Sequence, residues 1–291
     1  RYPESAATEL TARLAARYDV APENIILGAG SVEIVSQLIR ATSAPGDEVV
    51  FAWRSFEAYP LLVRTAGAVP VQVPLNAQHG HDLDAMLAAI TDRTSLVMVC
   101  NPNNPTGTTV GTAELTAFLD AVPSNVTVLL DEAYVHFNRR PDTAVGIEAF
   151  RAYPNVVVAH TFSKAYGLAG MRVGYAIAPA ELVGAMRKMA VPFGVTTPAQ
   201  TAAIASLDVE DELQTRVDAL IAERERVVSA LTAAGWRLPE TETNFVWFPL
   251  GDDTTAALEV FEAHGLTVRG FAGEGLRATI AETEANDRLI A

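Results

Sequence analysis

The sequence predicts an α/β protein in which a large domain, with a mainly parallel sheet between helices, is followed by a small α+β domain. The first observation is that short apolar runs alternate with helix-like segments along most of the chain. The second is that several runs are continuously apolar, as a strand requires when both faces of its sheet are covered. The third is a change of pattern after residue 208, where a long charged helical segment begins.

The elements of the large domain follow in order. Leu and Ala recur with helical spacing over residues 4–17, and a short apolar run follows at 25–27. The turn at 28–31 contains two glycines, and the pattern predicts a helix over 32–41 directly after it. Further strands are expected at 47–52, 68–73, 94–101, 126–133, 155–162 and 172–178. Further helices are expected near 56–66, 82–90 and 111–121.

The C-terminal part begins with a charged helical pattern over residues 210–235. After it we expect strands at 244–250, 266–269 and 275–280, and a helix at 253–264. This mixture predicts a small α+β unit. We place the boundary inside the long helix, so that residues 1–222 form the large domain and residues 223–291 the small one.

Composition excludes several classes of protein. The chain has 291 residues, of which 49% are hydrophobic and 19% are charged, so it can bury a full core. Its net charge of −14 argues against a nucleic-acid partner or an anionic membrane surface, because both need concentrated Lys and Arg. No apolar run reaches the roughly 18 residues that span a bilayer. We therefore expect a small-molecule partner.

Cysteine usage bears on the compartment. Cys100 is the only cysteine, which excludes an internal disulfide and a cysteine-rich metal cage. We expect no metal site and a cytoplasmic location.

One stretch carries the strongest chemical signal, TFSKAYGLAGMR at residues 161–172. An ordinary lysine is solvated on the surface, but Lys164 follows an apolar strand, near the edge where open α/β sheets bind ligands. A lysine desolvated there can form a Schiff base with a carbonyl group. Thr161, Ser163 and Arg172 can supply two hydroxyls and a guanidinium to one phosphate.

An aldehyde cofactor that bears a phosphate would need further groups. The turn GAGS at 28–31 precedes a helix whose N-terminal N–H groups can receive the phosphate, although many strand–helix connections contain glycines. Asp131, in the DEAY string after an apolar strand, can hold a pyridine nitrogen protonated; the alternatives are a helix cap or a metal ligand. Asn104, in NPNNPTG at 101–107, can hydrogen-bond a ring hydroxyl or a substrate carboxylate. Phe56 can stack on a flat ring or belong to the core.

Four motifs carry a family resemblance: GAGS, NPNNPTG, DEAY and TFSKAYGLAGMR. In this order and spacing they resemble those of the fold-type I pyridoxal-phosphate aminotransferases, and the resemblance spans nearly the whole chain. Within that group, RYPE at 1–4 is similar to the histidinol-phosphate aminotransferases. Two further segments are more similar to the actinobacterial aromatic-amino-acid (phenylalanine) aminotransferases: GDEVVFAWRSFEAYP at 46–60 and CNPNNPTGT at 100–108.

The resemblance implies roles for individual residues in the large domain. Lys164 would carry pyridoxal 5'-phosphate covalently and move a proton during catalysis, and Asp131 would pair with the ring nitrogen. Tyr134 and Asn104 would hydrogen-bond the ring oxygen, and Phe56 would stack on the ring. The phosphate would be held by Ser31, the Val32 backbone, Thr161, Ser163 and Arg172.

The resemblance also implies contacts that lie outside this pocket. Tyr2 would enter the phosphate site of a second subunit, which implies a homodimer. Arg277 would receive the substrate carboxylate, with Arg269 in the same pocket. In relatives an N-terminal arm that contacts substrate precedes the position of Arg1, and a further helix follows the C-terminal end.

Three functions are compared. The leading one is transamination between an aromatic L-amino acid and 2-oxoglutarate, and the alternative enzyme is a histidinol-phosphate aminotransferase of histidine biosynthesis. A non-catalytic regulatory module is disfavoured because Lys164, Asp131 and Tyr134 are all retained and no basic DNA-binding segment is seen. A nicotinamide-binding Rossmann enzyme is excluded because the turn at 28–31 lacks the G-x-G-x-x-G fingerprint.

Overall fold

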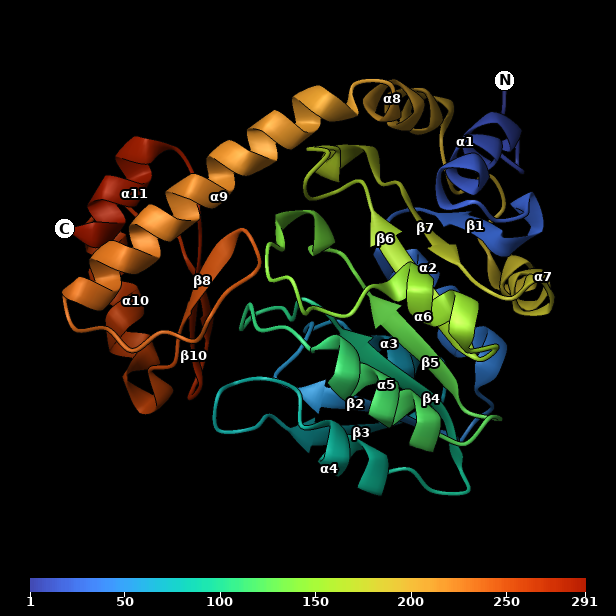
Figure 1. The fold of residues 1–291 in the computed structure, drawn as a ribbon, viewed down its shortest axis with the longest axis horizontal. Coiled ribbons are helices and arrows are strands. Elements are labelled where there is room, and N and C mark those ends of the chain that lie inside the picture. The colour runs from blue at the N-terminus through green and yellow to red at the C-terminus, as the bar shows by residue number, and fades with distance from the viewer.

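The computed structural model describes residues 1–291 and confirms a mixed α/β architecture with a mainly parallel sheet (Figure 1). The large sheet has the strand order β1-β7-β6-β5-β4-β2-β3. Its strands are β1 (Ile25–Gly28), β2 (Glu48–Trp53), β3 (Val69–Pro74), β4 (Thr94–Cys100), β5 (Thr127–Asp131), β6 (Val156–Thr161) and β7 (Gly174–Ile177). Only β7 runs antiparallel to its neighbours.

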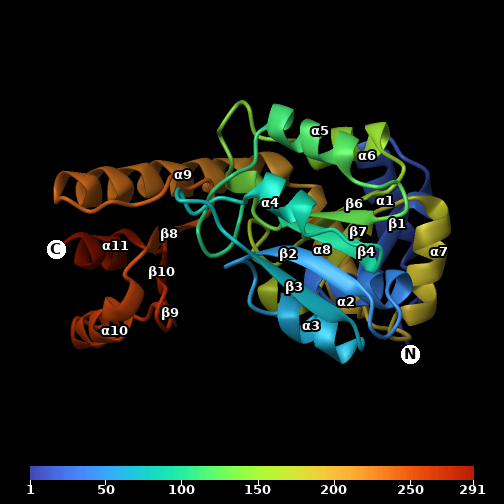
Figure 2. The same ribbon diagram turned by 90° about the horizontal axis from the view of Figure 1, so that it is seen from below.

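Helices cover both faces of this sheet (Figure 2). One face packs against α2 (Ser31–Thr42), α3 (Tyr59–Thr65) and α7 (Ala180–Met189). The other packs against α4 (Leu83–Ala88), α5 (Thr112–Ala121) and α6 (Gly146–Ala152). At the β1 end of the sheet, α1 (Thr8–Tyr18) packs with α8 (Thr197–Leu207). The continuous apolar strands are explained by this arrangement, because successive side chains enter the two cores alternately.

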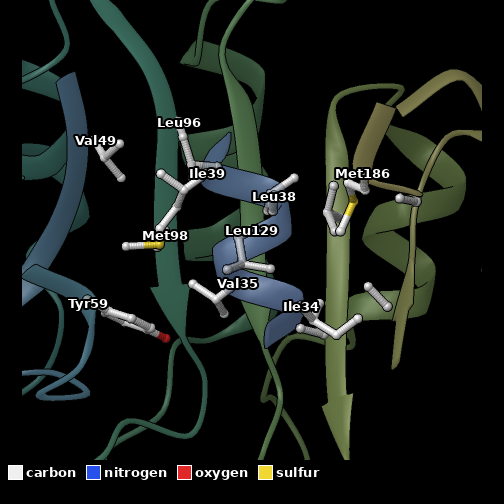
Figure 3. Close-up of a cluster of buried hydrophobic side chains, with 14 of the residues drawn as sticks. Ile34, Val35, Leu38, Ile39, Val49, Tyr59, Leu96, Met98, Leu129 and Met186 are labelled. Carbon is white, nitrogen blue, oxygen red and sulfur yellow. The ribbon is translucent and has the colours of Figure 1, made fainter. Parts of the chain in front are cut away.

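Helix α2 shows how the pattern becomes a packed core. Its apolar residues at positions 34, 35, 38 and 39 form one stripe, which faces side chains of three neighbouring strands (Figure 3). Leu38 is fully buried, with Leu96 and Leu129 in the same cluster. This packing holds the N-terminal end of α2 at a fixed position relative to the sheet.

The small lobe is built on a separate antiparallel sheet, with the strand order β8-β10-β9. Its elements are β8 (Phe245–Phe248), α10 (Thr254–Ala263), β9 (Arg269–Phe271), β10 (Gly275–Thr279) and α11 (Thr283–Ile290). Helix α9 (Glu210–Ala233) runs from α8 to this lobe (Figure 1). No helix is both long and apolar enough to cross a membrane.

The packing of α9 supports the domain boundary near residue 222, which stays a prediction. Val217 and Ile221 pack with Tyr134 of the large domain, in a cluster that also includes Phe245 of β8. One to three turns later, Val227 and Leu231 belong to the core of the small lobe. The large domain contributes Tyr134 and Phe137 to the earlier cluster, whereas the buried residues of the later one all come from α9 and the small lobe.

Several element boundaries differ from the sequence expectation. Helix α1 begins at Thr8 instead of residue 4, because Ala7 has a left-handed backbone and Glu4 caps Thr8. Strand β9 begins only at Arg269, because the Leu266 N–H bonds to the Phe261 carbonyl and closes the end of α10. Helices α6, α7, α8 and α11 were not expected from the sequence pattern.

We predict that Leu38→Ala lowers the free energy of unfolding by about 2–5 kcal/mol, because it leaves a cavity between α2 and the sheet. Urea denaturation of the purified protein measures this change. Leu61→Ala, at a leucine in α3 that is 62% exposed, is the control and should change it by less than about 0.5 kcal/mol. Equal losses in the two variants would contradict the described core.

Candidate active site

A pocket lies at the carboxyl edge of the large sheet, where β4, β5 and β6 end side by side. It is lined by Ser31, Val32, Phe56, Cys100, Asn104, Asp131, Ala133, Tyr134, Thr161, Ser163, Lys164, Ala169 and Arg172. Every residue that the sequence predicted for the cofactor is present except Tyr2. Ligands bind at this edge in open α/β sheets because the loops that follow neighbouring parallel strands converge there.

Lys164 lies in the loop after β6, lines the pocket and is partly exposed to water. Its amine nitrogen lies 5.1 Å from the centroid of the Tyr134 ring. Burial of the amine lowers the pKa of Lys164, and the positive charge of Arg277 acts in the same direction. The neutral, nucleophilic amine is therefore more accessible at neutral pH than in a solvated lysine.

Asp131 is the last residue of β5 and its side chain is buried. One carboxylate oxygen accepts a hydrogen bond from the Tyr59 hydroxyl at 2.7 Å, and the other accepts one from the Ala133 N–H at 3.2 Å. Burial raises the pKa of Asp131, whereas these two donors lower it. No arginine or lysine forms a salt bridge with the carboxylate. The pocket thus presents a desolvated acid without a salt-bridge partner, although the charge of Lys164 also lowers its pKa.

The opposite end of the pocket is suited to an anion. Arg172 donates to the Ser163 hydroxyl at 3.2 Å and to the Ala29 carbonyl at 3.2 Å, and the Thr161 hydroxyl accepts the Ser163 N–H at 3.0 Å. The N-terminus of α2 begins at Ser31 beside this cluster, and its first N–H groups have no partner within the helix. A guanidinium, hydroxyls and a helix N-terminus are the groups that bind phosphate in proteins.

Gly30 makes this close approach possible. Its φ is +81°, and a Cβ atom built there would lie 2.2 Å from the Arg172 Nη2. Only glycine fits both the backbone conformation and the contact. The GAGS turn and the TFSKAYGLAGMR stretch, well separated in sequence, therefore meet at one point.

Arg277 of the small lobe does not line the pocket but contacts Asn104, which does. Its Nη1 donates to the Asn104 Oδ1 at 2.5 Å, and its guanidinium lies 4.9 Å from the centroid of the Phe245 ring. Its buried Nε has no hydrogen-bond partner. Burial raises the pKa of the Tyr134 hydroxyl, which keeps that side chain protonated as a hydrogen-bond donor.

Three predicted residues do not line the pocket: Arg277, which contacts it only through Asn104, and also Tyr2 and Arg269. Tyr2 is 82% exposed and stacks on Phe193 at 4.9 Å, so its role in a second subunit stays a prediction. Arg269 forms a salt bridge with Glu57 at 2.8 Å, and its substrate role also stays a prediction. The sequence analysis missed Tyr59, which forms a hydrogen bond with Asp131. The only feature of the sequence that could have pointed to it is its position three residues after Phe56.

We predict that Gly30→Ala weakens the binding of inorganic phosphate by about tenfold or more, because the added methyl group displaces Arg172. Phosphate titration of the purified protein, followed by phosphorus NMR, measures the affinity. Gly184→Ala is the control, since a Cβ atom there meets nothing within 4 Å. Unchanged affinity in Gly30→Ala would show that Arg172 does not belong to the anion site.

Comparisons with known proteins agree with this geometry. The sequence profile of the family described as aminotransferase class I and II matches residues 1–291. An aromatic amino acid aminotransferase of Streptomyces coelicolor is 58% identical over 290 residues, which cover 100% of this chain and 81% of that protein. An enzyme with the same name from Thermobifida fusca is 54% identical over 290 residues, covering 100% of this chain and 80% of that protein.

Solved structures share the fold. The histidinol-phosphate aminotransferase of Sinorhizobium meliloti, solved in complex with pyridoxal-5'-phosphate, superposes with a TM-score of 0.91 at 30% identity. That likeness covers 100% of this chain and 81% of the other. A Thermus thermophilus aspartate aminotransferase tetra mutant has a TM-score of 0.87 at 27% identity, covering 100% of this chain and 86% of the other. With its whole length matched, the chain belongs to the aminotransferase class I and II family.

Proposed function

We propose that this chain is an aromatic-amino-acid aminotransferase that uses pyridoxal 5'-phosphate and passes the amino group to a 2-oxo acid such as 2-oxoglutarate. The observation that carries the proposal is the meeting of Lys164, Asp131 and Arg172 around one pocket, from motifs far apart in sequence. The names of the relatives at 54–58% identity support the aromatic donor. The anion-binding groups around Arg172 and the aromatic face of Phe56 support pyridoxal 5'-phosphate as the cofactor.

The residues present fit pyridoxal phosphate. The pocket provides an amine for its aldehyde, an aromatic face at Phe56, and an anion site at Arg172. The strongest indication is Asp131, a buried acid with only two neutral donors, which suits a cationic ring nitrogen as partner. When bound, pyridoxal phosphate supplies a ring that withdraws electrons from the α-carbon of the amino acid.

Lys164 has two tasks in this proposal: it holds the cofactor, and its free amine moves the proton at the α-carbon. The lowered pKa of Lys164 suits both, because a base works best when its pKa lies near the working pH. Tyr134 and Asn104 line the same wall and orient the ring oxygen through hydrogen bonds. Asp131 keeps the ring nitrogen protonated by placing a negative charge beside it.

Arg277 is proposed to bind the α-carboxylate of the substrate. Its hydrogen-bond partner Asn104 is neutral, so its positive charge is not compensated by an acid. A guanidinium presents the fork of donors that matches a carboxylate. The charge of Arg277 also lowers the pKa of the Lys164 amine, which supports a carboxylate site near the reacting amine.

The neighbouring arginines favour an aromatic donor over histidinol phosphate. A phosphate dianion needs more than one uncompensated cation, and the candidates beside Arg277 are Arg54 and Arg269. Arg54 is bound in a fork to Glu274 and stacks on Trp53, and Arg269 is paired with Glu57. These pairs leave one free guanidinium, which is enough for an α-carboxylate.

A homodimer is part of the proposal. Tyr2, Val191 and Phe193 are large apolar side chains exposed on one side of the chain, at 82%, 61% and 44%. Tyr2 stacks on Phe193, so the three lie on a surface suited to a second subunit.

We predict that Arg277→Ala raises KM for phenylalanine and for the 2-oxo acid about 30- to 150-fold, because both lose a charge-assisted carboxylate contact of about 2–3 kcal/mol. Steady-state kinetics with each substrate varied in turn measures the change. Arg216→Ala, at an exposed arginine of α9, is the control and should leave both values unchanged. An unchanged KM in Arg277→Ala would remove the residue from the substrate site.

We predict that phenylalanine, tyrosine and tryptophan are better donors than histidinol phosphate, by kcat/KM in a panel with 2-oxoglutarate as acceptor. The reason is that Glu274 and Glu57 neutralise the arginines that a phosphate would need. A tenfold advantage for histidinol phosphate would favour the alternative enzyme. Binding of pyridoxal phosphate without transfer from any donor would favour a non-catalytic protein.

A further inference from the structure

Tyr59 is a buried residue that does not line the pocket but forms a hydrogen bond with Asp131, which does. It is the first residue of α3 and is 0% exposed. Its hydroxyl donates to the Asp131 Oδ2 at 2.7 Å, within the usual range for a hydrogen bond to a carboxylate. A buried tyrosine hydroxyl needs a partner, and Tyr59 finds it in the one acid that faces the pocket.

The hydrogen bonds of Asp131 show why this contact matters. The Ala133 N–H serves Oδ1, so the Tyr59 hydroxyl is the only donor from the chain to Oδ2. A buried carboxylate without donors takes up a proton and loses its charge. The Tyr59 hydroxyl counters this effect, since it is the largest influence that lowers the pKa of Asp131.

The Tyr59 ring is fixed by two aromatic contacts. Phe51 lies edge-on at 5.7 Å with an interplanar angle of 70°, and Phe56 at 5.6 Å with an angle of 86°. Phe56 also lines the pocket. Phe51 and Phe56 therefore hold the Tyr59 ring, and with it the hydroxyl, in one place. A phenylalanine at position 59 would keep both ring contacts and lose only the hydroxyl.

We propose that Tyr59 is a positioning residue that keeps the Asp131 carboxylate charged and oriented toward the ring nitrogen of a cofactor in the pocket. The inference rests on the proposed function, because it needs a ligand whose ring carries a basic nitrogen. Tyr59 touches no reacting atom and acts only through Asp131.

The test compares Tyr59→Phe with wild type by titrating cofactor-free protein with two ligands. One is pyridoxal phosphate, and the other is its deaza analogue, in which carbon replaces the ring nitrogen. We expect the Tyr59→Phe variant to bind pyridoxal phosphate about tenfold more weakly than wild type does. Its affinity for the analogue should be unchanged, because only the ring nitrogen interacts with the charge on Asp131. Equal losses for both ligands, or no loss for either, would overturn the inference.

Tyr153→Phe is a matched control. The Tyr153 hydroxyl also donates to an aspartate at 2.7 Å, Asp120, but on the exposed surface. It should bind both ligands within twofold of wild type. A tenfold loss of pyridoxal phosphate affinity there would also overturn the inference, since the effect would then not be specific to Asp131.

A second pair of variants separates an effect through the charge of Asp131 from a loss of packing around Tyr59. In an Asp131→Asn background the side chain carries no charge, so adding Tyr59→Phe should change pyridoxal phosphate affinity less than twofold. A tenfold further loss would contradict action through the charge. If wild-type protein itself does not bind pyridoxal phosphate, the proposed function fails instead, and the two failures are therefore distinguished.

Discussion

The buried carboxylate of Asp131 is the constraint on which the rest of the site depends. Taking a charged acid out of water is costly unless hydrogen bonds or an opposite charge compensate it. The folded chain provides two hydrogen-bond donors and no salt bridge, and although the charge of Lys164 also lowers the pKa of Asp131, burial still raises that pKa, so the compensation within the chain is incomplete. In the proposed function, the cationic ring nitrogen of the cofactor supplies the compensation that the chain lacks.

The sheet topology places the partners of Asp131 around it. Strands β4, β5 and β6 are parallel neighbours, so Cys100, Asp131 and Thr161 end at the same edge. Lys164 follows β6 by three residues and Asn104 follows β4 by four. The helix α2 enters the same edge, with Gly30 allowing its N-terminus to approach Arg172. Amine, acid and anion site are thus set by strand order rather than by long loops.

The sequence predicted the strands and most of the pocket because both depend on local patterns. Continuous apolar runs identify buried strands, and Lys164, Asp131 and Asn104 lie at the end of such runs or within four residues after them. The surroundings of Arg269 could not be predicted, because its partner Glu57 lies 212 positions away in the chain. Tyr59 was missed for the same reason: an aromatic residue at a helix start is usually core, and only the tertiary fold brings Asp131 to its hydroxyl.

The central claim is that Lys164 is the residue that holds pyridoxal phosphate, and chemical trapping tests it most directly. Borohydride reduction of the protein loaded with pyridoxal phosphate makes the link between the aldehyde and an amine permanent, and peptide mass spectrometry then locates it. We predict a single modified peptide, with the added mass on Lys164, and none in Lys164→Ala. Modification of Lys188, the only other lysine of the chain, or of no lysine at all, would contradict the claim.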